Sequence, residues 1–120
     1  MQKLTSREEE IMQIFWQRGP SFVKEVIEDF PEPKPHYNTV STLIRILETK
    51  SFLAHKAFGN THQYYALISK EAYQAVAVED FVKRFFNNSI PEMVTSFAKK
   101  EKISPEELNK ILKEIKKDKS

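Results

Sequence analysis

Residues 37–45 place polar side chains on one side of a predicted helix and aliphatic side chains on the other. The polar side carries Tyr37, Asn38, Ser41, Thr42 and Arg45. Asparagine can pair bidentately with adenine, and a serine or threonine side chain can contact a base or a thymine methyl group. An arginine lower on such a helix favours a backbone phosphate. This pattern predicts a helix that reads base edges in the major groove of double-stranded DNA.

The rest of this helix supports the same interpretation. Thr39 adds a hydroxyl that can contact a phosphate or cap the helix. The opposite face is aliphatic, as a buried stripe requires, and consists of Val40, Leu43, Ile44 and Leu47. A solvated surface is the alternative for each polar residue alone. The set contrasts with an entirely aliphatic opposite face, which favours the DNA-reading interpretation.

Two alternating segments follow this helix at once and predict a β-hairpin. Residues 52–58 and 62–68 are the expected strands, with Gly59-Asn60-Thr61 as the turn. Such a hairpin, or wing, can contact phosphates or the minor groove. Its candidate contact residues are Lys56, Asn60, Thr61 and His62. A mobile hairpin without contacts is the alternative.

Two further helices must position the reading helix and the wing. The first is expected to open at Thr5 or Ser6, with Glu8 or Glu9 completing a capping box, and to stop at Gly19-Pro20. Ser21 is expected to cap the second helix. Three helices followed by a hairpin form the order of a winged helix-turn-helix.

The charge distribution agrees with this placement. Residues 1–33 have a net charge of −3, residues 34–67 a net charge of +3, and residues 68–120 a net charge of +2. The positive surplus therefore falls on the helix and wing segment, where a phosphate backbone would lie. Chance over a short window is the alternative explanation.

Enzymatic and metal chemistry find little support in the sequence. The chain has two glycines and no cysteine, and it contains no phosphate-cradling loop or nucleophile elbow. His55 and His62 lie on the two predicted strands and could face each other, but no cysteine or acidic cluster joins them. We therefore expect no enzyme activity, metal or cofactor. The absence of cysteine and of a long apolar run is compatible with a cytoplasmic protein that does not insert into a membrane.

The C-terminal half predicts helices that need a partner. Helices are expected from residue 70 to residue 87, from about residue 91 to residue 102, and from Ser104 onward. A segment of this length rarely buries enough apolar surface alone, and a second copy of the chain is the simplest partner. The residues expected at this homodimer interface are Phe81, Phe85, Phe86, Ile90, Phe97, Ile111 and Ile115. The alternative is that these helices fold back on the N-terminal half.

Several segments resemble the BlaI/MecI/CopY family of the penicillinase-repressor type. The stretch Thr39-Val40-Ser41-Thr42-Leu43-Ile44 is similar to the family's recognition helix, and Ile14-Phe15-Trp16 to its first helix. Glu92-Met93-Val94-Thr95-Ser96-Phe97-Ala98 resembles the family's C-terminal half. The resemblance covers nearly the whole chain.

The resemblance implies a dimeric transcriptional repressor that binds palindromic operators. In several members a membrane-bound sensor protease relieves repression by cutting before a phenylalanine, and the matching bond here is Ser96–Phe97. Familiar members have asparagine in place of this serine. Another branch senses copper through cysteines, and this chain has none.

The sequence thus predicts a mainly α fold with a small β-hairpin wing. Residues 1–69 are expected to form a winged helix-turn-helix, and residues 70–120 a helical dimerisation domain. The leading interpretation is a repressor on an inverted-repeat operator. The alternative is a winged-helix protein-interaction or architectural module without sequence preference.

Overall fold

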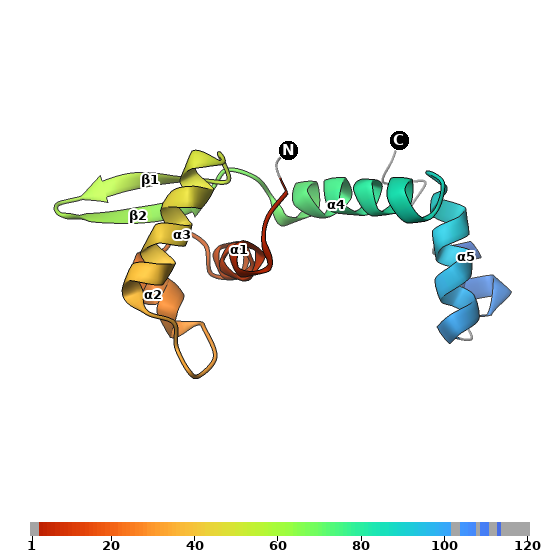
Figure 1. Cartoon of the computed structure of the whole chain (residues 1–120), viewed down its shortest axis with the longest axis horizontal. Coiled ribbons are helices and arrows are strands. Elements are labelled where there is room, and N and C mark those ends of the chain that lie inside the picture. Colours follow the sequence, from red (N-terminus) through yellow and green to blue (C-terminus); the bar gives the residue numbers. More distant parts are fainter. Residues whose placement is uncertain (1–2, 102–103, 108, 111–112, 114–120) are drawn as a thin grey trace. The chain divides into compact units, whose positions relative to one another are not determined.

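A computed structural model describes residues 3–101, 104–107, 109–110 and 113. Its elements follow the chain in the order α1 (Ser6–Arg18), α2 (Val23–Glu28), α3 (Tyr37–Thr49), β1 (Leu53–Phe58), β2 (Thr61–Ala66), α4 (Lys70–Phe85) and α5 (Ile90–Glu101) (Figure 1). Residues 105–107, 109–110 and 113 are also helical. This order confirms the predicted mainly α fold with a winged helix-turn-helix and a two-stranded hairpin.

The residue contacts divide the chain into two units, residues 1–74 and residues 75–120. The division falls inside α4, so the first turn of this helix belongs with the wing and the helices before it. The first unit has a continuous apolar core drawn from α1, α2, α3 and the hairpin. Its fully buried members include Ile11, Met12, Val26, Ile44, Leu47 and Phe52.

A capping box opens α1. The Thr5 hydroxyl accepts a hydrogen bond from the Glu8 N–H at 3.2 Å, and the Glu8 carboxylate accepts one from the Thr5 N–H at 2.8 Å. Of the two pairings that the sequence allows, Thr5 with Glu8 is the one that forms. The helix ends at Arg18 and is capped by Gly19, whose φ of +89° is a conformation that residues with a Cβ rarely adopt.

The expectation that Ser21 caps the second helix is wrong. The helix begins at Val23 with Phe22 at its N-cap. The backbone of Ser21 instead pairs with Tyr64 of β2, donating at 2.9 Å and accepting at 2.8 Å, and its hydroxyl donates to the Gly19 carbonyl. Because the serine backbone is engaged by the hairpin, the chain stays extended for one more residue before α2 starts.

The hairpin is antiparallel, with Leu53 opposite Ala66 and Phe58 opposite Thr61. Its turn has two residues, and Gly59 at the first of them has a φ of +62°. Two-residue hairpin turns need a positive φ at this position, which glycine supplies without strain. Thr61, which the sequence places in the turn, is the first residue of β2.

A buried ion pair joins the start of α1 to the end of α3. The Lys50 ammonium lies 2.8 and 2.9 Å from the two carboxylate oxygens of Glu8, a residue that is 2% exposed. Burial raises the pKa of Glu8, but the hydrogen bonds from Lys50 and Thr5 outweigh it and leave this pKa below its usual value. The ion pair therefore stabilises the fold only while Glu8 is ionised.

The chain turns from α3 into the hairpin through a Schellman motif. The Phe52 N–H donates to the Leu47 carbonyl at 2.9 Å, and the Ser51 N–H donates to the Glu48 carbonyl at 3.0 Å. The residue between helix and strand, Ser51, has a φ of +66°. Glycine is the usual residue at this left-handed position because it has no Cβ to clash.

We expect Ser51→Gly to increase the free energy of unfolding by about 0.5–1 kcal/mol. The gain is the relief of left-handed strain, reduced by the greater freedom of glycine in the unfolded chain. Urea unfolding of the full chain measures it. Thr49→Gly, in the regular last turn of the same helix, is the control and should lower stability by about 0.3–0.5 kcal/mol. A loss of stability in Ser51→Gly would contradict this explanation.

We expect Glu8→Gln to lower the free energy of unfolding by about 2 kcal/mol near pH 7, because glutamine keeps the cap but leaves Lys50 unpaired. Because the pKa of Glu8 is lower in the folded state, the stability it contributes is present above its unfolded pKa of 4.5. This contribution is lost as the pH falls through the folded pKa of Glu8. The difference between wild type and variant should therefore shrink toward about pH 3.

The control for this variant is Thr5→Ala, which removes the cap and keeps the ion pair. It should cost about 1 kcal/mol and retain the acid sensitivity of the wild type. Urea unfolding at the two pH values gives both comparisons. Equal losses for Glu8→Gln at both pH values would show that the ion pair contributes nothing.

Candidate nucleic-acid interface

The exposed side of α3 carries the residues that the sequence selected. Val40, Ile44 and Leu47 are buried in the core. Successive helical residues are 100° apart, so Asn38, Thr42 and Arg45 point away from this core. All three are exposed. The structure therefore leaves this polar face open along the first two turns of the helix, where a groove-binding helix contacts bases.

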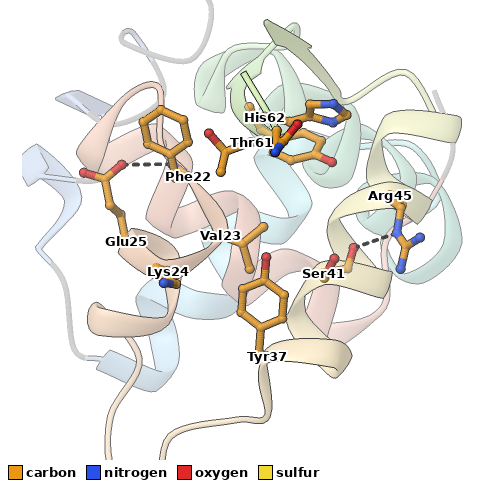
Figure 2. A pocket seen from close by; sticks show the side chains of 11 residues that line it. Phe22, Val23, Lys24, Glu25, Tyr37, Ser41, Arg45, Thr61 and His62 are labelled. Atoms are coloured by element: carbon orange, nitrogen blue, oxygen red, sulfur yellow. Dashed lines mark hydrogen bonds between the residues drawn. The ribbon is translucent and has the colours of Figure 1, made fainter. Parts of the chain in front are cut away.

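A hollow of about 590 Å³ lies beside this face, between α3, the start of α2 and the hairpin (Figure 2). Figure 2 shows Lys24 and Glu25 on one side of it and Ser41 and Arg45 on the other. Six of the ten predicted contact residues line this hollow. They are Tyr37, Ser41, Arg45, Asn60, Thr61 and His62.

The other four predicted residues lie elsewhere. Asn38 and Thr42 point outward from α3, and Thr39 lies on the flank of the helix away from the hollow. Lys56 lies on the opposite face of the hairpin from His62, because alternate residues of a strand point to opposite faces. The structure does not bring Lys56 together with the hollow.

Lys56 instead borders a second concavity, of about 490 Å³, on the other side of the hairpin. Its neighbours there include Gly19, Pro20, Gln63 and Tyr65. Phosphate contact by Lys56 stays a prediction. It would come from a different face of the wing than contact by His62.

The sequence reasoning missed the contribution of α2. Phe22, Val23, Lys24 and Glu25 line the hollow opposite α3. They are there because the backbone pairing between Ser21 and Tyr64 holds the start of α2 against the hairpin. Lys24, an exposed residue in the first turn of α2, was the available signal, but the sequence alone does not show which other element lies beside this turn.

The positive surplus of residues 34–67 is smaller at the surface than the sequence suggests. Lys50 is paired with Glu8, and the Lys34 ammonium donates to the carbonyls of Glu28 at 2.9 Å and Phe30 at 2.8 Å. Among the described residues, Lys24, Arg45 and Lys56 are exposed and have no carboxylate within ion-pair distance. These three are the cations best placed for phosphates.

The two histidines of the hairpin stack on each other, as the sequence suggested. Their ring centroids are 4.1 Å apart, with an angle of 9° between the planes. His55 Nδ1 also contacts the carboxylate of Glu48 on α3. Within the described part of the chain, no group of three or more histidine, cysteine or acidic side chains is arranged to hold a metal ion.

The second unit exposes phenylalanine side chains. Phe81 is 37% exposed, Phe85 62% and Phe97 47%. Phe86 links them, with its ring 5.7 Å from Phe81 and 6.0 Å from Phe97. Ile90 is half-buried. The remaining predicted interface residues, Ile111 and Ile115, lie outside the described residues.

The bond between Ser96 and Phe97 lies inside α5, and both residues are exposed. In the described residues of this unit, burial is confined to Val82, Val94 and Ala98. None of the helices in the described ranges has the length and apolar character needed to cross a membrane.

Comparison with known proteins gives a consistent result over nearly the whole chain. A family model described as penicillinase repressor matches residues 4–117. The methicillin resistance regulatory protein MecI of Staphylococcus aureus is 26% identical over 110 residues, which cover 91% of this chain and 89% of that protein. The penicillinase repressor of Bacillus licheniformis is also 26% identical, over 91% of this chain and 86% of its own.

Proposed function

We propose a specific function for this chain, which belongs to the penicillinase repressor family and is therefore a DNA-binding transcriptional repressor rather than an enzyme. It acts in the cytoplasm as a homodimer on an inverted-repeat operator. The observation that carries the proposal is the open polar face of α3 beside the hollow formed with α2 and the hairpin. In size and chemistry this face of α3 matches the contact face of a helix that enters a major groove.

The contacts divide into base reading and positioning. Asn38, Thr42 and Ser41 are the candidates for base edges, since they lie in the first turns of α3. Arg45 and the hairpin tip are the candidates for phosphates, to which we add Lys24 at the start of α2. Tyr37 and Thr39 flank the reading residues, where a hydroxyl can reach the backbone.

The exposed phenylalanines of the second unit support dimerisation. Phe85 and Phe97 leave large apolar rings in contact with water, and a second copy would cover them. In a dimer the two recognition helices would lie about 34 Å apart, which is one turn of DNA, or a multiple of that distance apart. One unit alone would bind weakly because a single helix and wing bury little surface.

Relief by proteolysis belongs to the same proposal. Cleavage of the Ser96–Phe97 bond by a membrane sensor protease would remove part of α5 and uncouple the half-sites. Both residues are exposed, and the few buried side chains of this unit favour local opening of the helix before a protease acts. The reading helix itself would be untouched.

The alternative is an interaction or architectural module without sequence preference. The engagement of Lys50 and Lys34 within the fold favours only the protein-interaction form of this alternative, because it leaves few free cations for non-specific binding to phosphates. The polar face of α3 does not favour it, since non-specific binding does not need amide and hydroxyl groups at the start of the helix.

Selection of the purified chain against random duplex DNA at near-physiological salt tests the proposal. Enrichment of an inverted repeat, together with a dimer in sedimentation, supports both the reading helix and the two-fold arrangement. Salt-sensitive retention without an enriched sequence would overturn it in favour of the architectural alternative. A monomer that protects both half-sites equally well would overturn the role of the second unit.

We expect Asn38→Ala to relax base preference at one operator position by about 1–3 kcal/mol. The amide is exposed in the first turn of α3 and has no other partner to lose among the described side chains. Binding to operators with each base at that position measures the change. Thr49→Ala, exposed at the far end of the same helix, is the control and should leave base preference unchanged.

We expect Lys56→Ala to weaken binding to all sequences alike and to reduce the salt slope by about 1, because one phosphate contact is lost. Titrations over a range of salt concentrations measure the slope. Lys34→Ala is the matched control, since its ammonium already binds backbone carbonyls. An unchanged slope in Lys56→Ala would place this lysine away from the DNA.

A further inference from the structure

One isoleucine of α3 lies outside the buried stripe of this helix. The other aliphatic residues point inward, since Val40, Ile44 and Leu47 are at most 1% exposed. Leu43 is half-buried and packs against the core. Ile46 is 38% exposed and is not among the residues that pack against this core. It therefore leaves a branched apolar side chain in water, on the helix that we propose enters the major groove.

The helical period places Ile46 on the outward side of α3. Residues four apart are separated by about 40° around the helix axis, so Ile46 shares a side with Thr42, one turn earlier. Thr42 is exposed as well. Ile44, which is fully buried, lies about 160° away around the axis. Ile46 is thus on the side of the helix that also carries the candidate base-reading residues.

This side of α3 has two edges of different chemistry. Arg45 and Ser41 line the hollow beside α2 and the hairpin, and Figure 2 shows both side chains on that edge. Ile46 is about 100° from Arg45 around the axis and does not line the hollow. A single exposed apolar residue is common on protein surfaces, so the position of Ile46 matters more than its exposure.

The major groove offers one apolar group to such a side chain. The base edges there carry hydrogen-bond donors and acceptors, and the C5 methyl group of thymine is the exception. An isoleucine cannot form hydrogen bonds with the polar groups, but it can remove that methyl group from water. This contact gains free energy in the same way as burial in a protein core.

We propose that Ile46 contacts the C5 methyl group of a thymine and thereby selects thymine at one position of each operator half-site. Ile46 acts as a specificity-determining residue beside the hydrogen-bonding residues of the same helix. This inference deepens the proposed function and rests on it, because it requires α3 to lie in the major groove.

The geometry of α3 limits where this thymine can lie. Ile46 follows Asn38 by eight residues, which is about 12 Å along a helix axis. Successive base pairs are about 3.4 Å apart along DNA. The thymine should therefore lie within about four base pairs of the base that Asn38 contacts.

The experiment removes single methyl groups from the DNA. The probe is the inverted repeat enriched by selection, in which each thymine of one half-site is replaced in turn by deoxyuridine. Uracil pairs with adenine as thymine does and lacks only the methyl group. Titrations with the full chain at constant salt should show binding weakened about fourfold at a thymine within that distance, which corresponds to one methyl group left in water.

The Ile46 variants assign the methyl contact to this residue. Ile46→Ala should bind the thymine and uracil duplexes equally at that position, and alanine, a strong helix former, keeps α3 intact. Ile46→Val retains a branched side chain and should keep most of the difference. Leu67→Ala is the matched control, because Leu67 is 53% exposed and follows β2, away from α3. It should show the full difference between the two duplexes.

A merely structural role of Ile46 would give a different result. Ile46→Ala would then weaken binding to the thymine and uracil duplexes alike and leave their ratio unchanged, which would overturn the inference. A ratio that disappears in Thr42→Ser instead would assign the methyl group to Thr42 and would also overturn it.

The outcomes separate this inference from the proposed function. An enriched half-site that has no thymine within the stated distance would overturn the inference and leave the proposed function standing. Tolerance of uracil at every such thymine would do the same. Failure of the selection to enrich any inverted repeat would overturn the proposed function, and the inference with it.

Discussion

The arrangement of the first unit depends on one buried carboxylate. Glu8 is removed from water, and such a group is tolerated only when its charge and lone pairs are satisfied. The Thr5 N–H at the start of α1 and the Lys50 ammonium at the end of α3 meet that requirement. The same contacts start α1 and hold the end of α3 against it. The orientation of α3, the proposed recognition helix, and of the hairpin that follows it through Ser51 therefore follows from a buried group outside the proposed interface.

This constraint also shapes the electrostatics of the interface. Lys50, one of the lysines in the positive surplus of residues 34–67, is used inside the fold, and Lys34 is used in the same way on carbonyls at and just after the end of α2. The surface that we propose faces DNA has few cations, so amides, hydroxyls and a histidine carry much of its chemistry. Such a surface discriminates through hydrogen bonds more than through charge, which suits a repressor that must find one site among many.

The two units differ in how they satisfy the hydrophobic effect. The first buries most of its large aliphatic and aromatic residues in one continuous core, whereas the second leaves the rings of Phe81, Phe85 and Phe97 partly in water. An incomplete core of this kind gains most of its stability when a partner covers it. The affinity for DNA would then depend on a contact that can be lost without damage to the reading helix.

The sequence by itself determined the order of elements, the polar and buried faces of α3, the two strands and the family, because each rests on local periodicity or on a contiguous motif. The features that depend on long-range contacts were decided only by the tertiary structure. It placed Ser21 against Tyr64 instead of at a helix cap, paired Lys50 with Glu8 across 42 residues of chain, and put Lys56 and His62 on opposite faces of the hairpin. The physical reason is that a helical or strand period specifies which way a side chain points from its own element. Which group that side chain contacts depends on how separate elements pack.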